Sequence, residues 1–199
     1  RKLDKLHATG LKTKDLIGIP WMLAFALRAD GWYLRRDIIW HKPNPMPESV
    51  QDRCTKAHEY IFLLSKSPKY FYDADAIKEP VENPGNPRKF RDGDANATLR
   101  NDEGRLYIPK DDRNKRSVWS VPVKPYSGAH FAVFPSELIE PCIMAGSRVG
   151  DIVLDPFMGS GTTAQVAQDL NRNFLGCELN PDYKSLQDKR LRQLSLELA

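Results

Sequence analysis

Cysteine is scarce in this sequence, and its three residues lie far apart. Cys54, Cys142 and Cys177 form no CxxC pair and no His/Cys spacing typical of a zinc site. We therefore expect reduced thiols, no metal and a cytoplasmic protein. No apolar run approaches the about 20 residues that a membrane-spanning helix needs, and the first residues do not resemble a signal peptide. The sequence thus predicts no membrane partner.

A strong excess of one charge is also missing. The 199 residues carry a formal net charge of +4, and 41% of them are hydrophobic. This mild basic excess is compatible with a nucleic-acid partner without requiring one. The apolar content is sufficient for a packed core and argues against disorder. Length and composition together indicate one α/β domain that carries an insertion.

Hydrophobic periodicity and turn residues predict the elements outside that insertion. The expected elements are a helix over residues 15–29, strands over 33–40, 59–65 and 69–73, and helices over 136–145 and 182–199. Thr13 is expected to cap the first helix, Pro20 to lie near its first turn and Gly31 to end it. The strands 59–65 and 69–73 are expected to pair with each other across a short turn.

Residues 79–116 differ in composition from the rest of the chain. They are rich in proline and glycine and contain few aliphatic side chains. Between Asn83 and Arg116, nine Arg or Lys residues against six Asp or Glu give a local balance of +3. This composition indicates a variable insertion or a binding loop.

A strand, a glycine turn, a helix and a second strand are expected between residues 152 and 178. This order is half of a doubly wound nucleotide-type fold. Gly159 and Gly161 let the backbone approach a ligand closely, and the following helix directs its N-terminal amides toward the same place. Glu178, at the end of the second strand, can accept hydrogen bonds from the two hydroxyls of a ribose.

More than one interpretation fits this glycine turn. The GxGxxA spacing that begins at Gly159, together with Glu178, also matches the fingerprint of NAD enzymes. Asp155 argues against NAD, because a carboxylate at the end of the strand repels a pyrophosphate. It suits a ligand that carries an ammonium and a sulfonium. A purely structural turn without a ligand is the third interpretation.

Three segments around the turn resemble motifs of the DNA amino-methyltransferases, which make N4-methylcytosine or N6-methyladenine. Residues 155–163 (DPFMGSGTT) resemble their cofactor motif, and residues 178–183 (ELNPDY) the ribose-binding motif that follows it. Residues 130–135 (HFAVFP) resemble the segment that covers the methionine end of the donor, where a Phe beside the sulfonium makes a cation–π contact. The resemblance implies an α/β, Rossmann-like S-adenosylmethionine-dependent methyltransferase sheet with a largely irregular target-recognition insertion. The cofactor-binding residues that it implies are Phe131, Phe134, Pro135, Asp155, Pro156, Phe157, Gly159, Ser160, Gly161, Thr162, Thr163, Glu178 and Asn180.

The resemblance extends upstream in the β-type motif order of that family, in which the catalytic half precedes the target-recognition region and the cofactor half. Residues 16–21, 37–49 and 53–61 resemble the motifs of the catalytic half. The implied division is a catalytic-half segment over 1–78, a target-recognition insertion over 79–125 and a cofactor-binding half over 126–199.

The family's catalytic tetrapeptide, Asp/Ser/Asn-Pro-Pro-Tyr/Phe, has no counterpart here. It accepts hydrogen bonds from the target amino group and stacks on the flipped base. No Pro-Pro dipeptide occurs in the 199 residues. The β-type order places the tetrapeptide before residue 1, so we expect an upstream segment to be absent. We therefore expect this chain alone to be inactive and to contain no catalytic residue.

The dipeptide Pro141-Cys142 matches the nucleophile of the cytosine-C5 methyltransferases. In that class it follows the cofactor motif on a later strand. Here it precedes the motif and lies within a predicted helix. We therefore interpret Cys142 as a core residue.

An enzyme that acts on a flipped base holds the phosphates on both sides of its target. The implied partner is double-stranded DNA, and the resemblance adds a homodimer and a cognate restriction endonuclease in a bacterial or phage-infected cell. The expected DNA-binding residues are Lys42, Asn44, Arg53, Lys56, His58, Arg113, Lys115, Arg116, Tyr126 and Ser127.

The sequence therefore predicts a site-specific DNA methyltransferase of restriction-modification type. It transfers a methyl group from S-adenosylmethionine to an exocyclic amino nitrogen of a flipped base, with cytosine N4 slightly favoured over adenine N6. One alternative is an incomplete fragment or homologue that binds DNA and cofactor without turnover. Another is an RNA or protein amino-methyltransferase that shares the cofactor half.

Overall fold

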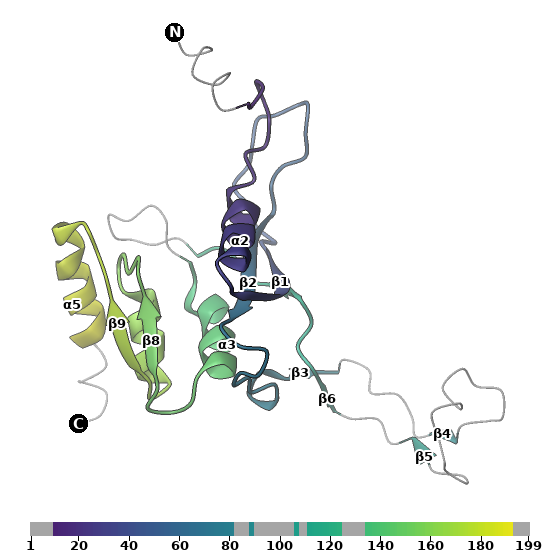
Figure 1. Cartoon of the computed structure of the whole chain (residues 1–199), viewed down its shortest axis with the longest axis vertical. Coiled ribbons are helices and arrows are strands. Elements are labelled where there is room, and N and C mark those ends of the chain that lie inside the picture. Colours follow the sequence, from purple (N-terminus) through teal and green to yellow (C-terminus); the bar gives the residue numbers. More distant parts are fainter. Residues whose placement is uncertain (1–9, 82–87, 90–105, 108–110, 125–133, 193–199) are drawn as a thin grey trace. The chain divides into compact units, whose positions relative to one another are not determined.

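The computed structural model describes residues 10–81, 88–89, 106–107, 111–124 and 134–192. The chain forms two compact units, one of Arg1–Tyr70 with Ser117–Pro125 and one of Phe71–Arg116 with Tyr126–Ala199. Figure 1 traces their elements. The longest described helices have 11 residues, and none in the described part is long and apolar enough to cross a bilayer.

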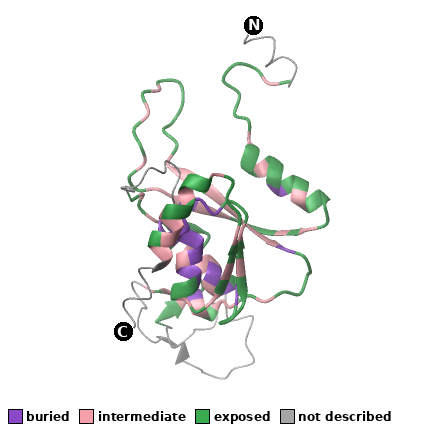
Figure 2. Cartoon of the chain, turned by 90° about the vertical axis from the view of Figure 1, so that its left-hand side faces the viewer, coloured by how far each residue is buried: buried purple, intermediate pink, exposed green. Residues whose placement is uncertain are grey.

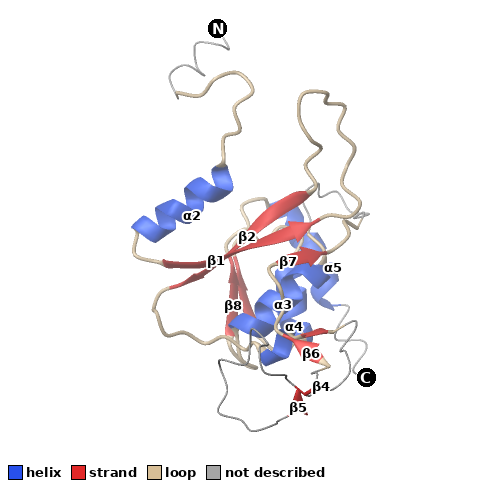
Figure 3. Cartoon of the chain, turned by 90° about the vertical axis from the view of Figure 1, so that its right-hand side faces the viewer, coloured by secondary structure: helices blue, strands red, loops and turns tan. Residues whose placement is uncertain are grey.

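In its described residues, the first unit contains helix α2 (Ile19–Ala29) and a three-stranded sheet in the order β2-β1-β7 (Figure 3). Strand β1 (Tyr33–His41) is antiparallel to β2 (His58–Ser65) and parallel to β7 (Val118–Ser120). Trp40 and Trp119 are register partners on β1 and β7, and both are buried. The predicted strands 33–40 and 59–65 are confirmed as β1 and β2, paired with each other.

Helix α2 begins later than the sequence predicted. Its N-cap is Gly18, with a φ of 74°, and Pro20 lies in its first turn, where a missing N–H costs nothing. The prediction that Thr13 caps the helix is therefore wrong. Gly31 ends the helix as predicted, with a φ of 97° that favours glycine.

The strand predicted over residues 69–73 is wrong. Strand β2 pairs with β1 instead. Within the second unit, the N–H of Asp73 donates to the carbonyl of Ala145 at 2.9 Å, and its Oδ1 accepts the N–H of Ala76 at 3.0 Å. Ala76 belongs to the short helix η1 (Asp75–Ile77), so Asp73 makes its hydrogen bonds to two helical segments and not to a neighbouring strand.

The predicted insertion has little regular structure in its described part. Strand β3 (Glu79–Pro80) pairs with β6 (Asp112–Arg113), and β4 (Arg88–Lys89) pairs with β5 (Leu106–Tyr107). Each pairing is antiparallel and only two residues long. Strand β7 also falls within the predicted range 79–125 and pairs with β1, and the division of the chain at residues 79 and 125 stays a prediction.

The centre of the second unit is a parallel strand–helix–strand motif. Strands β8 (Ile152–Asp155) and β9 (Asn173–Gly176) pair in parallel, and α4 (Thr162–Asp169) connects them and packs on both. Ile143 of α3 with Val166 and Ala167 of α4 forms a buried cluster against that sheet, and Figure 2 shows the buried residues gathered in these helices. The bounds are α3 (Ser136–Gly146), β8 (Ile152–Asp155), α4 (Thr162–Asp169), β9 (Asn173–Gly176), η3 (Pro181–Tyr183) and α5 (Lys184–Arg192).

Most sequence-based expectations for this unit are confirmed. The helix predicted over 136–145 is α3, and the strand–turn–helix–strand order between 152 and 178 is that of β8, α4 and β9. The helix predicted over 182–199 begins as η3 and continues as α5, and residues 193–199 lie outside the described part. Strand β9 ends at Gly176, so Glu178 lies in the turn that follows.

The three thiols should differ in reactivity. Burial in α3 raises the pKa of Cys142 to about 11, whereas Cys54 and Cys177 are exposed. At about pH 8, iodoacetamide should therefore modify Cys54 and Cys177 and spare Cys142 until the protein is unfolded. Peptide mass spectrometry measures this. Modification of native Cys142 as fast as that of Cys54 would contradict its assignment to the core.

Candidate functional site

The turn between β8 and α4 is built around two glycines in the left-handed region. Gly159 has a φ of 52° and Gly161 a φ of 86°, conformations that other L-residues adopt at a cost. Thr162 and Thr163, which open α4, are buried. Phe157, at the start of the turn, is 88% exposed. Gly159, Ser160 and Gly161 are buried as well, so the turn is packed within the protein and its exposed side chain is the ring of Phe157.

The carboxylate of Asp155, the last residue of β8, is hydrogen-bonded within this turn. Its Oδ1 accepts the N–H of Phe157 at 2.9 Å. Its Oδ2 accepts the hydroxyl of Thr163 at 2.6 Å. Asp155 thus connects the end of the strand with the start of α4 and fixes the path between them.

The carboxylate of Glu178 connects the glycine turn with the turn after β9. Its Oε2 accepts the N–H of Gly159 at 2.7 Å, and its Oε1 accepts the N–H of Asn180 at 2.8 Å. Because β8 and β9 are parallel, their carboxyl ends meet at one sheet edge. The two acids predicted from the sequence therefore engage the same turn.

The chemistry of this site fits a ligand with hydroxyls and positive charge. Each carboxylate oxygen can accept more than one hydrogen bond, so Asp155 and Glu178 keep acceptor capacity beside the bonds they make to the protein. Two negative groups at the glycine turn are unfavourable for a pyrophosphate. The site therefore fits a nucleoside with a cationic substituent better than a dinucleotide.

The other predicted cofactor residues lie close to this turn in sequence or at the start of α3. Asn180 caps η3 by accepting the N–H of Asp182 at 3.0 Å. Pro135 is buried at the N-cap of α3, next to the half-buried Phe134. Phe131 lies outside the described residues.

Sequence reasoning missed three residues at this site. Leu179 follows Glu178 directly and is 98% exposed, a position that the motif could have indicated. Gln187 and Arg190 of α5 donate hydrogen bonds to the glycine turn and to the first residue of α4. No local pattern indicates these two, because the contact depends on how α5 is oriented after η3.

Two predicted DNA-binding cations lie near the connection between β1 and β2 in the first unit. Lys42 pairs with Glu59, and its Nζ lies 4.4 Å from the ring centroid of Trp40. Arg53 pairs with Glu48 at 2.5 Å. Both positive charges are thus held by acidic neighbours on the protein.

The other predicted DNA-binding residues of the first unit are Asn44, Lys56 and His58, and their surroundings differ. The side chain of Asn44 donates to the carbonyl of Val123 at 2.9 Å and accepts its N–H at 2.8 Å. This pair of hydrogen bonds to the backbone uses the amide to fasten the segment after β7. The ring of His58 packs edge-on against Tyr60, and Lys56 is exposed.

In the second unit, two predicted DNA-binding arginines share one acid at the base of the insertion. Arg113 and Arg116 donate to Oε1 of Glu79 at 2.8 and 2.5 Å. Burial of Glu79 opposes its ionisation, but the hydrogen bonds from Arg116 and Arg113 outweigh it and lower its pKa. Lys115 lies between them in sequence. Tyr126 and Ser127 lie outside the described residues.

A comparison with known families decides among the interpretations of this site. A sequence model described as DNA methylase, of the N6/N4 methyltransferases, matches residues 8–189. The chain belongs to this DNA methylase family. The family resemblance proposed from the sequence is therefore confirmed.

The relatives of this chain include two bacterial Type II methyltransferases. M.Cfr9I of Citrobacter freundii is 51% identical over 183 residues, covering 92% of this chain and 52% of that protein. M.SmaI of Serratia marcescens is 52% identical over 182 residues, covering 92% of this chain and 54% of that protein. The chain thus spans about half the length of these curated relatives.

Solved structures agree with the family. The M1.HpyAVI–SAM complex superposes with a TM-score of 0.56 at 25% identity, covering 88% of this chain and 71% of that one. A putative DNA modification methylase of Thermus thermophilus, also complexed with S-adenosylmethionine, gives 0.56 at 26% identity, covering 88% and 60%. The predicted S-adenosylmethionine-dependent methyltransferase fold of this chain is therefore confirmed, and its family uses that cofactor.

Removal of either carboxylate should weaken binding of S-adenosylmethionine. Asp155→Ala and Glu178→Ala are each expected to cost about 1–3 kcal/mol, the scale of a lost charge-assisted hydrogen bond. Isothermal titration calorimetry measures the loss. Glu140→Ala, which removes an exposed carboxylate from α3, is the matched control. Unchanged affinity in both site variants would contradict the assignment.

Acidification should release the pair of arginines at Glu79. The pKa of Glu79 is lowered in the folded state. The stabilisation that its ion pairs give the fold is therefore present above the unfolded-state pKa of Glu79 and is lost as the pH falls through the folded-state pKa. The partner side chains Arg113 and Arg116 are 37% and 65% exposed, so solvent screening limits the contribution to below about 1 kcal/mol. Urea unfolding across pH should show this loss in the parent and not in Glu79→Gln. An identical pH profile for both proteins would refute it.

Proposed function

We propose that this chain carries the cofactor-binding and part of the DNA-binding surface of a site-specific Type II DNA methyltransferase. The proposed reaction transfers a methyl group to an exocyclic amino nitrogen of a flipped base, with cytosine N4 slightly favoured over adenine N6. The observation that carries the proposal is the pair of carboxylates, Asp155 and Glu178, on one glycine turn. The family and its Type II relatives support it.

The cofactor would be held by residues at the carboxyl ends of β8 and β9. Glu178 offers its oxygens to the ribose hydroxyls, and Asp155 adds negative charge that favours a cationic ligand over a phosphate. Phe157 and Leu179, both exposed apolar side chains, would be covered by a purine. When bound, S-adenosylmethionine supplies an electrophilic methyl group on a sulfonium.

DNA would be held through the basic residues of both units. Lys42, Arg53 and Lys56 offer phosphate contacts near the β1–β2 connection, and the arginines beside Glu79 offer them at the base of the insertion. Asn44 has its amide engaged with Val123, so we assign it to holding this segment in place. Double-stranded DNA is the proposed partner.

The test of the function is the product made by the complete reading frame that contains these residues. Expressed in a bacterium without DNA methylation, it should produce N4-methylcytosine or N6-methyladenine, measured by mass spectrometry of genomic nucleosides. Asp155→Ala should reduce the amount of product, and Glu140→Ala should leave it unchanged. The 199-residue chain, which has no Pro-Pro dipeptide, should bind cofactor without methylating DNA. Cofactor binding without either modified base from the complete frame would favour the binding-only alternative.

A further inference from the structure

Helix α5 contributes two polar side chains to the glycine turn and the start of α4, and neither belongs to a motif identified in the sequence. Gln187 and Arg190 are three residues apart, so they lie on the same face of the helix. The side chains of both are partly buried. Both side chains therefore make contacts within the protein, beside the glycine turn.

The first contact fixes the backbone at Gly159. Its carbonyl accepts a hydrogen bond from Nε2 of Gln187 at 2.8 Å, while its N–H donates to Glu178 at 2.7 Å. The two peptide groups on either side of the Gly159 Cα are therefore held by different residues from different elements. The hydrogen bond to Glu178 involves a carboxylate that the ribose would also use. The hydrogen bond from Gln187 does not.

The second contact lies at the start of α4. Arg190 donates from Nη1 to Oγ1 of Thr162 at 2.5 Å. Between the two contacts, a Cβ built on Gly161 would lie 3.5 Å from Cγ of Gln187, an ordinary packing distance. Helix α5 therefore lies directly against the turn, and it is hydrogen-bonded to Gly159 and to Thr162.

We propose that Gln187 and Arg190 are positioning residues that keep the glycine turn in its cofactor-binding conformation independently of Glu178. Ribose hydroxyls would share the Glu178 carboxylate with the N–H of Gly159, whereas the contacts from α5 do not involve that carboxylate. The turn then needs no reorganisation on binding, which favours affinity. This inference rests on the proposed cofactor site at Asp155 and Glu178.

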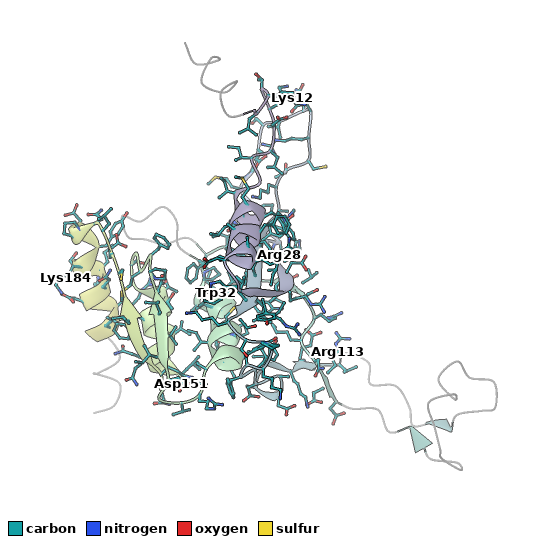
Figure 4. All side chains as sticks on the ribbon, viewed as in Figure 1. Lys12, Arg28, Trp32, Arg113, Asp151 and Lys184 are labelled. Carbon is teal, nitrogen blue, oxygen red and sulfur yellow. The ribbon has the colours of Figure 1, made fainter. Side chains whose placement is uncertain are left out.

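Conservative substitutions separate this role from general stability. Gln187→Glu keeps the size of the side chain but cannot donate to a carbonyl, and Gln187→Met keeps its length without polar atoms. Arg190→Lys retains a cationic donor, whereas Arg190→Ala does not. The matched control is Lys189→Ala, which removes an exposed cation from the same helix. Lys184, labelled in Figure 4, marks the first turn of that helix.

Calorimetry with S-adenosylmethionine on the 199-residue chain gives the first readout. Gln187→Glu, Gln187→Met and Arg190→Ala should each weaken binding by about 5- to 30-fold, as expected for one lost hydrogen bond in a partly buried site. Arg190→Lys should restore most of the affinity, and Lys189→Ala should bind like the parent. Equal affinity in all variants, or an equal loss in Lys189→Ala, would overturn the proposal.

Amide hydrogen exchange without cofactor gives the second readout. The Gln187 and Arg190→Ala variants should exchange faster in residues 159–162 while β8, β9 and α3 keep the exchange of the parent. Unchanged exchange in the turn would overturn the positioning role. If the parent chain binds no S-adenosylmethionine, the proposed function fails, and this exchange measurement still decides whether α5 holds the turn.

Discussion

The structure of the candidate site depends on one carboxylate that joins two turns. Glu178 accepts one backbone N–H from the glycine turn after β8 and one from the turn after β9. Parallel pairing of the two strands brings both turns to one sheet edge, and the carboxylate then fixes their separation. Hydrogen bonds to a charged acceptor are about twice as strong as neutral ones. The same oxygens are the natural partners of ribose hydroxyls, so one group serves both the fold and the proposed binding.

At the opposite end of the strand–helix–strand motif, hydrogen bonds from Arg172 connect the ends of α3 and α4. Asn171, just after α4, adopts the left-handed conformation, and Arg172 donates to the carbonyls of Ser147 and Leu170. The guanidinium thereby satisfies carbonyls at the ends of α3 and α4 that the helices leave unpaired. Between this end and the glycine turn lies the buried cluster of Val166 and Ala167 with α3. The site is thus placed by a packed core and not by its loops alone.

The sequence predicted what local pattern and glycine chemistry determine. The order β8, glycine turn, α4 and β9 follows from an apolar strand, left-handed positions and helical spacing, and it is confirmed. The prediction of a strand over 69–73 is wrong although its aromatic residues favour a strand. Asp73 is instead hydrogen-bonded to Ala145 and to Ala76 of η1. Thr13 failed as a cap because Gly18 and Pro20 start the helix later. Gln187 could not be predicted, since its contact with Gly159 is tertiary.

The most direct test of the central claim observes the amides that Glu178 binds. In a two-dimensional NMR spectrum of the isotope-labelled chain, addition of S-adenosylmethionine should shift the amide signals of Gly159 and Asn180 more than those of α3. An equal amount of NAD should leave them unchanged. Large shifts with NAD, or unshifted Gly159 and Asn180 amides in the presence of saturating S-adenosylmethionine, would contradict the account.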